Sequence, residues 1–302
     1  MISVITSSVN KKNLECFVTS LKQTIGVPYE LIIINNPGLM GICAAYNEGA
    51  TQAKYDIVCF VHEDVEFLTM NWGLNIIRHF ELNENAGVIG VAGAICKSKM
   101  PYGWIQPGLK SMNPNRVNII QEYKHTATKS DRFYINPFNE TRSLVVALDG
   151  VFLATKKEIW QRYPFEEKLL KGFHGYDIEF SLHIGTVKEN YVVYDILLKH
   201  KSEGVFDLKW FEGVLKVYKK WNKLLPVSKS DMIGKDEFAY IDNYCFNELL
   251  LIKVSNKKEK YRKLLMCFQL IPIIGIKNFM SNHFMNFLKL LLNRHPLGKY
   301  QH

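Results

Sequence analysis

The most informative stretch of the sequence is an apolar run that ends in a cluster of ionisable residues. Residues 57–61 read Ile-Val-Cys-Phe-Val, and His62, Glu63, Asp64 and Glu66 follow closely. Such a run is typical of a buried parallel strand, and open α/β sheets bind ligands beyond the carboxyl ends of their strands. Carboxylates in that position suit a hard divalent cation, which in turn suits a phosphate-bearing substrate. The alternative is an acidic loop that only keeps the end of the strand solvated.

Other polar side chains recur where the predicted elements begin or end. They are Thr6, Ser7 and Ser8 after a first strand, Asn35 and Asn36 after a second, Asn47 in a helix, Asp149 after a later strand, the run His174-Gly175-Tyr176-Asp177 before Glu179, and His200. Asp177 and Glu179 stand near the start of a predicted helix, where the helix dipole favours anions. For Asp177 the alternative is a simple N-cap, and for Asp149 it is a residue of the turn before Gly150.

Alternating strands and helices would bring these residues together. The predicted strands cover residues 2–6, 29–34, 55–61, 88–92, 144–148 and 192–196, and the predicted helices cover 13–24, 41–53 and 72–82. This alternation predicts an α/β fold with a doubly wound, mostly parallel sheet. No G-x-G-x-x-G follows the first strand and no G-x-x-x-x-G-K-[ST] is present, which argues against a dinucleotide site and a P-loop.

Length and cysteine content point to an ordinary reduced globular protein. The 302 residues are enough for one large domain with an appendage. The six cysteines are scattered without a C-x-x-C pair, which predicts buried thiols rather than disulfides or a metal site. The N-terminus reads as a first strand, so we expect no signal peptide.

The positive charge is concentrated in the last fifty residues. Residues 253–302 hold ten lysines and arginines against one acid, Glu259, so they account for the whole formal charge of +9. The apolar stretch 264–276 is shorter than the roughly 20 residues of a membrane span. Basic residues beside short apolar helices suit an anionic membrane surface, with Phe284, Phe287, Leu288 and Leu291 as the residues expected to insert. The alternative is a helical cap on the core. The segment shows no nucleic-acid-binding module, and we expect no nucleic-acid partner.

Taken in order, these motifs resemble the inverting family-2 glycosyltransferases with the A-type (GT-A) fold. The resemblance covers about residues 1–225 and is strongest to their bacterial branch, in which H-x-D replaces D-x-D. It implies a GT-A nucleotide-sugar-binding domain over 1–225 and a helical basic extension over 226–302. It also implies a role in bacterial surface polysaccharide synthesis, at the inner, cytoplasmic face of the cell membrane.

The resemblance assigns a role to each motif. The last acid of the D-x-D motif falls on Asp64, which is expected to bind Mn²⁺ or Mg²⁺, with His200 as a further ligand. Expected donor contacts, to a nucleotide-sugar of which a UDP-sugar is the leading candidate, are Thr6, Ser7, Ser8, Asn35, Asn36, Asn47, His62, Glu63 and Asp149. His62 departs from the family's aspartate, which puts its usual contact with the ribose in doubt.

The same resemblance places the catalytic base on Asp177. An inverting transfer needs one carboxylate that takes the proton from the attacking acceptor hydroxyl. Tyr176 replaces the glutamate of the family's E-D motif, which puts the details of acceptor recognition in doubt. The expected residues on the acceptor side are Trp104, His174, Tyr176 and Glu179, and the expected acceptor is a glycan or a lipid-linked sugar. The alternatives are a non-catalytic carbohydrate- or lipid-binding homologue and a nucleotidyltransferase, although this chain lacks the glycine-rich loop of the latter.

Overall fold

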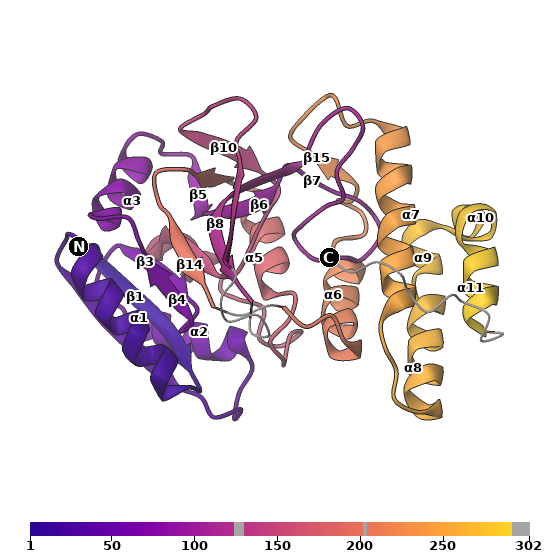
Figure 1. The fold of residues 1–302 in the computed structure, drawn as a ribbon, viewed down its shortest axis with the longest axis horizontal. Coiled ribbons are helices and arrows are strands. Elements are labelled where there is room, and N and C mark those ends of the chain that lie inside the picture. Colours follow the sequence, from indigo (N-terminus) through magenta and orange to yellow (C-terminus); the bar gives the residue numbers. More distant parts are fainter. Residues whose placement is uncertain (124–129, 202–203, 292–302) are drawn as a thin grey trace.

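A seven-stranded sheet forms the centre of the computed structural model, which describes residues 1–123, 130–201 and 204–291 (Figure 1). The strand order is β10-β13-β5-β12-β3-β1-β2. The strands are β1 (Ile2–Ser8), β2 (Tyr29–Asn35), β3 (Ile57–Val61), β5 (Ala86–Gly90), β10 (Arg142–Val145), β12 (Phe152–Lys156) and β13 (Glu189–Val193).

Most of these strands run in one direction. β1 pairs in parallel with both β2 and β3, and β13 pairs in parallel with β5. β12 lies antiparallel between β3 and β5, and β10 lies antiparallel at the edge next to β13. β3 and β5 therefore point the same way, and their carboxyl ends meet at one edge of the sheet. The predicted α/β fold with a mostly parallel sheet is confirmed.

Helices cover both faces of the sheet because its central strands are apolar on both sides. In β3, Ile57, Cys59 and Val61 pack with α1 and α3, whereas Val58 and Phe60 pack with α2 and α5 on the other face. This is the period of two that an extended chain imposes on its side chains. The helices of this part of the chain are α1 (Lys11–Thr24), α2 (Ile42–Gln52), α3 (Trp72–Glu81), α4 (Lys157–Arg162), α5 (Tyr176–Ile184) and α6 (Leu208–Trp221).

A second sheet brings distant segments to the carboxyl end of β3. It has the order β11-β6-β8-β14-β4, with β9 paired to β8. In it β14 runs antiparallel to β4, and His200 stands opposite Val65. The strands are β4 (Val65–Phe67), β6 (Ala92–Ala94), β8 (Asn115–Glu122), β9 (Ser130–Ile135), β11 (Ala147–Leu148) and β14 (Leu198–His200), and a small separate pair is formed by β7 (Cys96–Lys97) and β15 (Val227–Ser228).

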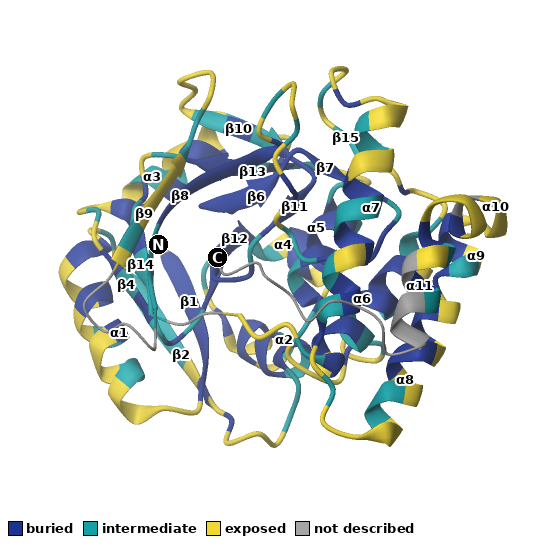
Figure 2. Ribbon diagram, turned by 45° about the vertical axis from the view of Figure 1, so that its right-hand side comes forward, coloured by how far each residue is buried: buried dark blue, intermediate teal, exposed yellow. Residues whose placement is uncertain are grey.

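The C-terminal helices stand beside the α/β part, next to α6 (Figure 1). They are α7 (Lys235–Leu251), α8 (Lys257–Phe268), α9 (Ile271–Ile274), α10 (Ile276–Asn278), the π-helical turn η1 (Phe279–His283) and α11 (Phe284–Leu291). Their buried side chains belong to the same apolar cluster as Phe211 and Val214 of α6. Figure 2 marks the buried residues along α6 and α7. Within the described residues, no helix is long and apolar enough to cross a membrane.

The structure corrects the expected membrane-inserting residues of α11. Phe287 is only 3% exposed and its ring contacts those of Phe268 and Phe279, with centroids 4.9 and 5.7 Å away. Phe284 and Leu288 are half-buried, and the side chain of Leu291 lies outside the described residues. The apolar face of α11 therefore faces the protein. Its apolar side chains are buried against neighbouring helices, so they are not available to a bilayer.

This packing gives a test of the C-terminal helices as part of the core. Phe287→Ala should lower the free energy of unfolding by about 3 kcal/mol, since it leaves a cavity in a packed cluster. Met285→Ala, two residues away and 65% exposed, should change it by less than about 0.5 kcal/mol. Urea denaturation of the full chain measures both variants. Equal effects of the two substitutions would show that α11 does not pack as described.

Candidate active site

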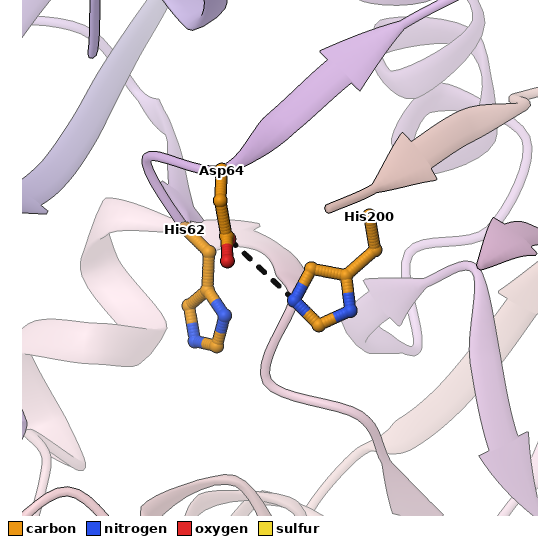
Figure 3. A group of neighbouring side chains, drawn as sticks. All are labelled: His62, Asp64 and His200. Atoms are coloured by element: carbon orange, nitrogen blue, oxygen red, sulfur yellow. Dashed lines mark ion pairs between the residues drawn. The ribbon is translucent and has the colours of Figure 1, made fainter. Parts of the chain in front are cut away.

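Three ionisable side chains converge at the carboxyl end of β3 (Figure 3). His62 and Asp64 follow β3 directly, and His200 ends β14. One potential ligand atom from each lies within 4.8 Å of the other two, and His200 Nε2 is 3.5 Å from Asp64 Oδ1. A backbone hydrogen bond from Lys201 N to Asp64 O fixes β14 beside this turn. The sequence predicted Asp64 and His200 as a pair, and the structure places His62 with them.

The hydrogen bonds of His62 define which of its nitrogens is available. Its Nε2 lies 2.6 Å from the Tyr176 hydroxyl, and that hydroxyl donates its single proton to the Gly150 carbonyl at 3.0 Å. His62 Nε2 must therefore carry the proton and donate it to Tyr176. Burial also lowers the pKa of His62, which favours the neutral ring. In the neutral ring Nδ1 keeps its lone pair, and this atom faces Asp64 and His200 (Figure 3).

The same argument applies to His200. Its Nδ1 lies 3.2 Å from Gln121 Oε1, while the Gln121 amide nitrogen donates to the carbonyls of His200 and Glu122. Because Oε1 can only accept, His200 Nδ1 is the donor, and Nε2 faces Asp64. Two imidazole nitrogens and a carboxylate thus face one another across a space in which a single ion could be bound. Such a set suits a divalent cation, and outer hydrogen bonds of this kind are the usual means of orienting metal-binding histidines. Imidazole ligands suit Mn²⁺ better than Mg²⁺, which prefers oxygen.

Asp177 and Asp149 form a second acidic group near this cluster. Burial and the nearby Asp149 carboxylate raise the pKa of Asp177 to about 7, although backbone N–H groups of residues 150, 177 and 178 oppose the shift. Asp149 Oδ1 itself accepts a hydrogen bond from Val151 N at 3.1 Å, as expected of a turn residue. A carboxylate whose pKa lies near neutrality is suited to accept a proton from a substrate hydroxyl.

Close packing fixes the start of α5, which carries Asp177. Gly175 adopts φ +83°, a conformation that other residues rarely adopt, and it lies against Gly213 and Val217 of α6. A Cβ atom at position 150 would come within 2.0 Å of the Tyr176 hydroxyl oxygen, so only glycine fits there. Tyr176 is 4% exposed. Its expected place on the acceptor side is therefore corrected: it is an internal support for His62.

Glu63 faces away from its two neighbours and organises the loop after β1. Its carboxylate accepts hydrogen bonds from Ser8 Oγ at 2.6 Å and from the backbone N–H groups of Val9 and Asn10. Asn10 in turn caps α1. The Ser8 hydroxyl is thereby used inside the protein. Glu63 thus holds the loop where we expected the nucleotide to bind, and its own oxygens are occupied.

The remaining polar residues after β1 and β2 differ in accessibility. Asn35 is exposed at the end of β2. Asn36 is fully buried and closes the following turn through Leu39 N, Met40 N and Met40 O, with Ser7 Oγ 3.3 Å from its amide nitrogen. Thr6 is also fully buried, and its hydroxyl has no hydrogen-bond partner among the described residues. Asn35 is thus the residue of this group that is open to a ligand, and it remains a predicted donor contact.

Two predicted site residues have internal partners instead. The Asn47 amide donates to Phe165 O and Glu167, and its oxygen accepts from Phe165 N and Trp160 Nε1, so it holds the chain between α4 and α5. Glu179 is fully buried and lies 2.6 Å from Lys220 Nζ of α6. These contacts correct the expectation that Asn47 faces a donor and Glu179 an acceptor.

Trp104 and His174 are the remaining residues expected on the acceptor side, and both are half-buried. Trp104 is half-buried and packs at the edge of the apolar cluster of α1 and α3. His174 is half-buried beside α6 and lines a cavity with residues 170–173. Burial lowers the pKa of His174, so its ring is neutral at pH 7. His174 stays a predicted acceptor contact.

Sequence reasoning missed the role of His62 in the cation site and the support that Gln121 gives to His200. The first could not be read from strand alternation, because residues 62–65 form a turn that is closed by a hydrogen bond from Val65 N to His62 O. The second had no local signal: Gln121 lies 79 residues from His200 and reaches it only through the pairing of β8 with β14.

The sequence also matches a known family. The model of the Glycosyltransferase like family matches residues 3–221, most of the chain and all of the segments that form this site. The chain belongs to this family. Glycosyltransferases of the GT-A class combine a fold of this kind with nucleotide-sugar donors, which confirms the expected fold and the expected class of enzyme at that level. No curated protein matches the chain in sequence.

Solved structures show distant likenesses to this glycosyltransferase. A crystal structure of GalNAc-T7 with UDP, GalNAc and Mn²⁺ aligns over 94% of this chain and 58% of that one, with 11% identity and a TM-score of 0.48. The structure of A197 from STIV aligns over 66% of this chain and 84% of that one, with 14% identity and a TM-score of 0.38. The chain thus spans less than two thirds of GalNAc-T7.

The raised pKa of Asp177 predicts a stability change with pH. An unfolded aspartate has a pKa of about 3.9, so between about pH 4 and 7 the folded state binds the extra proton and stability falls as the pH rises. Asp177→Asn removes this loss of stability, because an amide does not ionise. Its midpoint of thermal unfolding should match wild type at pH 4, exceed it increasingly up to pH 7, and then level off, in buffer with a chelator. A constant difference between the two proteins from pH 4 to 8 would contradict the shift.

Proposed function

We propose that this glycosyltransferase transfers a sugar from a nucleotide-sugar, with a UDP-sugar as the leading candidate, to a glycan or lipid-linked acceptor with inversion. One observation carries the proposal: two imidazole nitrogens and a carboxylate converge at the end of β3, near the half-buried carboxylates of Asp149 and Asp177. The first group suits a cation bound to a diphosphate, and the second suits removal of a proton. A metal-assisted transfer of a sugar to a hydroxyl with inversion uses both.

The donor would bind along the carboxyl ends of β1, β2 and β3. Asn35 is open to the nucleotide at the end of β2, and Glu63 sets the course of the loop after β1. His62, Asp64 and His200 would hold Mn²⁺, or less favourably Mg²⁺. When bound, the ion neutralises the charge that develops on the leaving diphosphate.

Asp177 would act as the general base. The acceptor hydroxyl approaches from the start of α5, loses its proton to the Asp177 carboxylate and attacks the anomeric carbon on the face opposite the diphosphate, so the configuration inverts. Asp149 contributes by raising the pKa of Asp177 towards the pH at which the enzyme works. The raised pKa makes Asp177 a stronger base, and a useful fraction is still ionised at neutral pH.

The wider setting is also a proposal. We place a GT-A domain at residues 1–225 and a helical extension at 226–302, in a bacterial enzyme of surface polysaccharide synthesis at the cytoplasmic face of the membrane. The basic C-terminal segment supports contact with anionic lipid. The exposed apolar residues that could enter a lipid surface are on α8: Tyr261, Leu265 and Phe268 are 69%, 62% and 48% exposed at spacings of four and three. This stripe replaces the face of α11 that the sequence suggested.

Two variants separate donor binding from chemistry. Asp64→Ala should remove the Mn²⁺-dependent thermal stabilisation by UDP-sugars, because it deletes a ligand of the cation. Asp177→Asn should keep that stabilisation and lower turnover by about 10²-fold or more, because an amide cannot accept the proton. Thermal shift with UDP-, GDP-, dTDP- and CMP-sugars and release of the nucleotide measure the two effects. Unchanged metal-dependent binding in Asp64→Ala, or near-normal turnover in Asp177→Asn, would reject the corresponding role. Wild-type binding without hydrolysis or transfer of any donor would favour a non-catalytic binding protein.

The α8 stripe gives the test of membrane contact. Leu265→Glu should release the protein from liposomes that contain a third phosphatidylglycerol, because it places a charge in the apolar stripe. Leu82→Glu is the matched control, since Leu82 is 69% exposed just after α3, at a distance from the basic segment. Co-sedimentation at low salt measures both, and high salt should weaken binding of the wild-type chain. Retention of Leu265→Glu at the wild-type level would contradict the proposed surface.

A further inference from the structure

A cavity beside the start of α5 has a chemistry that the proposed reaction leaves unexplained. Its volume is about 580 Å³, and it lies between the chain segment 170–174 and the first half of α6. His174, in its wall, stands three residues before Asp177. The cavity therefore borders the place where the proposed base begins its helix, and its wall also contacts the start of α2 through a hydrogen bond from Ile42 N to Gly172 O.

Three lysines line this cavity. Lys209 and Lys216 lie seven residues apart, on one face of α6, and Lys171 comes from the opposite wall. None of the three forms an ion pair or hydrogen bond with another described residue, whereas Lys219 and Lys220 of the same helix are both engaged, with Gln269 and with Glu166 and Glu179.

The acids in the same wall are already neutralised or used. Glu212 pairs with Arg262 of α8, and Asp207 accepts a hydrogen bond from Trp210 N as the N-cap of α6. With Glu212 neutralised by Arg262, the three lysines of the lining share the cavity with one further carboxylate, Asp207, and His174 is neutral. The cavity carries an excess of two positive charges, although residues 1–252 as a whole are close to neutral.

We propose that this cavity binds a phosphate or diphosphate group of the acceptor. The inference rests on the proposed glycosyl transfer, because it names the class of acceptor that reaches Asp177. Primary ammonium groups bind phosphate oxygens as point charges, and three of them around one cavity match the charge of a diphosphate. Phe173, 45% exposed at the edge, offers an apolar face beside them. A sugar joined through a diphosphate to a carrier would place its hydroxyl near Asp177 and its diphosphate on the lysines.

The test measures binding directly, without turnover. Hexyl diphosphate serves as the probe, titrated into the full chain by calorimetry in buffer with EDTA, so that the cation site takes no part. The double variant Lys209→Ala with Lys216→Ala should weaken binding about tenfold or more. Lys223→Ala, an exposed lysine just beyond α6 and outside the cavity, should leave the affinity unchanged.

Other results would contradict the phosphate subsite or change the class of ligand assigned to it. If the wild-type chain does not bind hexyl diphosphate, or if the double variant binds it equally well, the phosphate subsite is overturned. If hexanoate binds as tightly as hexyl diphosphate, the cavity takes carboxylates and the assignment to phosphate is wrong. Donor hydrolysis by the wild-type chain is measured separately. Its absence would remove the proposed transfer, whereas the binding result would still decide whether the cavity is a phosphate subsite.

Discussion

The hydroxyl of Tyr176 is the point on which the site depends. It accepts a hydrogen bond from His62 Nε2 and donates one to the Gly150 carbonyl. This single hydroxyl therefore connects the end of β3, the turn after β11 and the start of α5. The cation ligand, the turn with Asp149 and the helix with Asp177 are fixed relative to one another by these two bonds. Because the hydroxyl is buried, an unmade bond there would be costly, and this keeps the arrangement in a single state.

The electrostatics of the site follow from this arrangement. The three segments bring Asp149 close to Asp177 in a poorly solvated place. Repulsion between two carboxylates and the loss of hydration both disfavour the ionised form there. The pKa of Asp177 rises because burial and the Asp149 carboxylate together outweigh the backbone N–H groups that stabilise its ionised form. Neutral His62 does little to relieve this repulsion. The support that orients the imidazole thus also helps to give the neighbouring carboxylate its basicity.

The sequence predicted the fold and the outline of the site, and it failed where tertiary contacts decide. The apolar run before His62 and the alternation of strands and helices were sufficient for the α/β sheet, whereas Asp64 and His200 were paired only through the resemblance to the glycosyltransferase family. The partners of Asn47 and Glu179, by contrast, come from segments more than forty residues away. A polar residue near a strand end or helix start has the same local pattern whether it meets a ligand or supports a distant loop. The face of α11 was misjudged for the same reason: an amphipathic pattern shows that a face is buried, but not by what.

The turn that carries His62, Glu63 and Asp64 has a consequence for how this site can change. The outer two side chains meet at the cation site, while the middle one holds the loop after β1. Gain or loss of one residue within this turn would break the hydrogen bond from Val65 N to His62 O that closes it, and it would redirect all three side chains. The loop would then lose its anchor and the cluster would lose two members in one step. We therefore expect related enzymes to tolerate changes of residue type here far better than changes of length. The length of this segment should vary less among them than the identity of its residues.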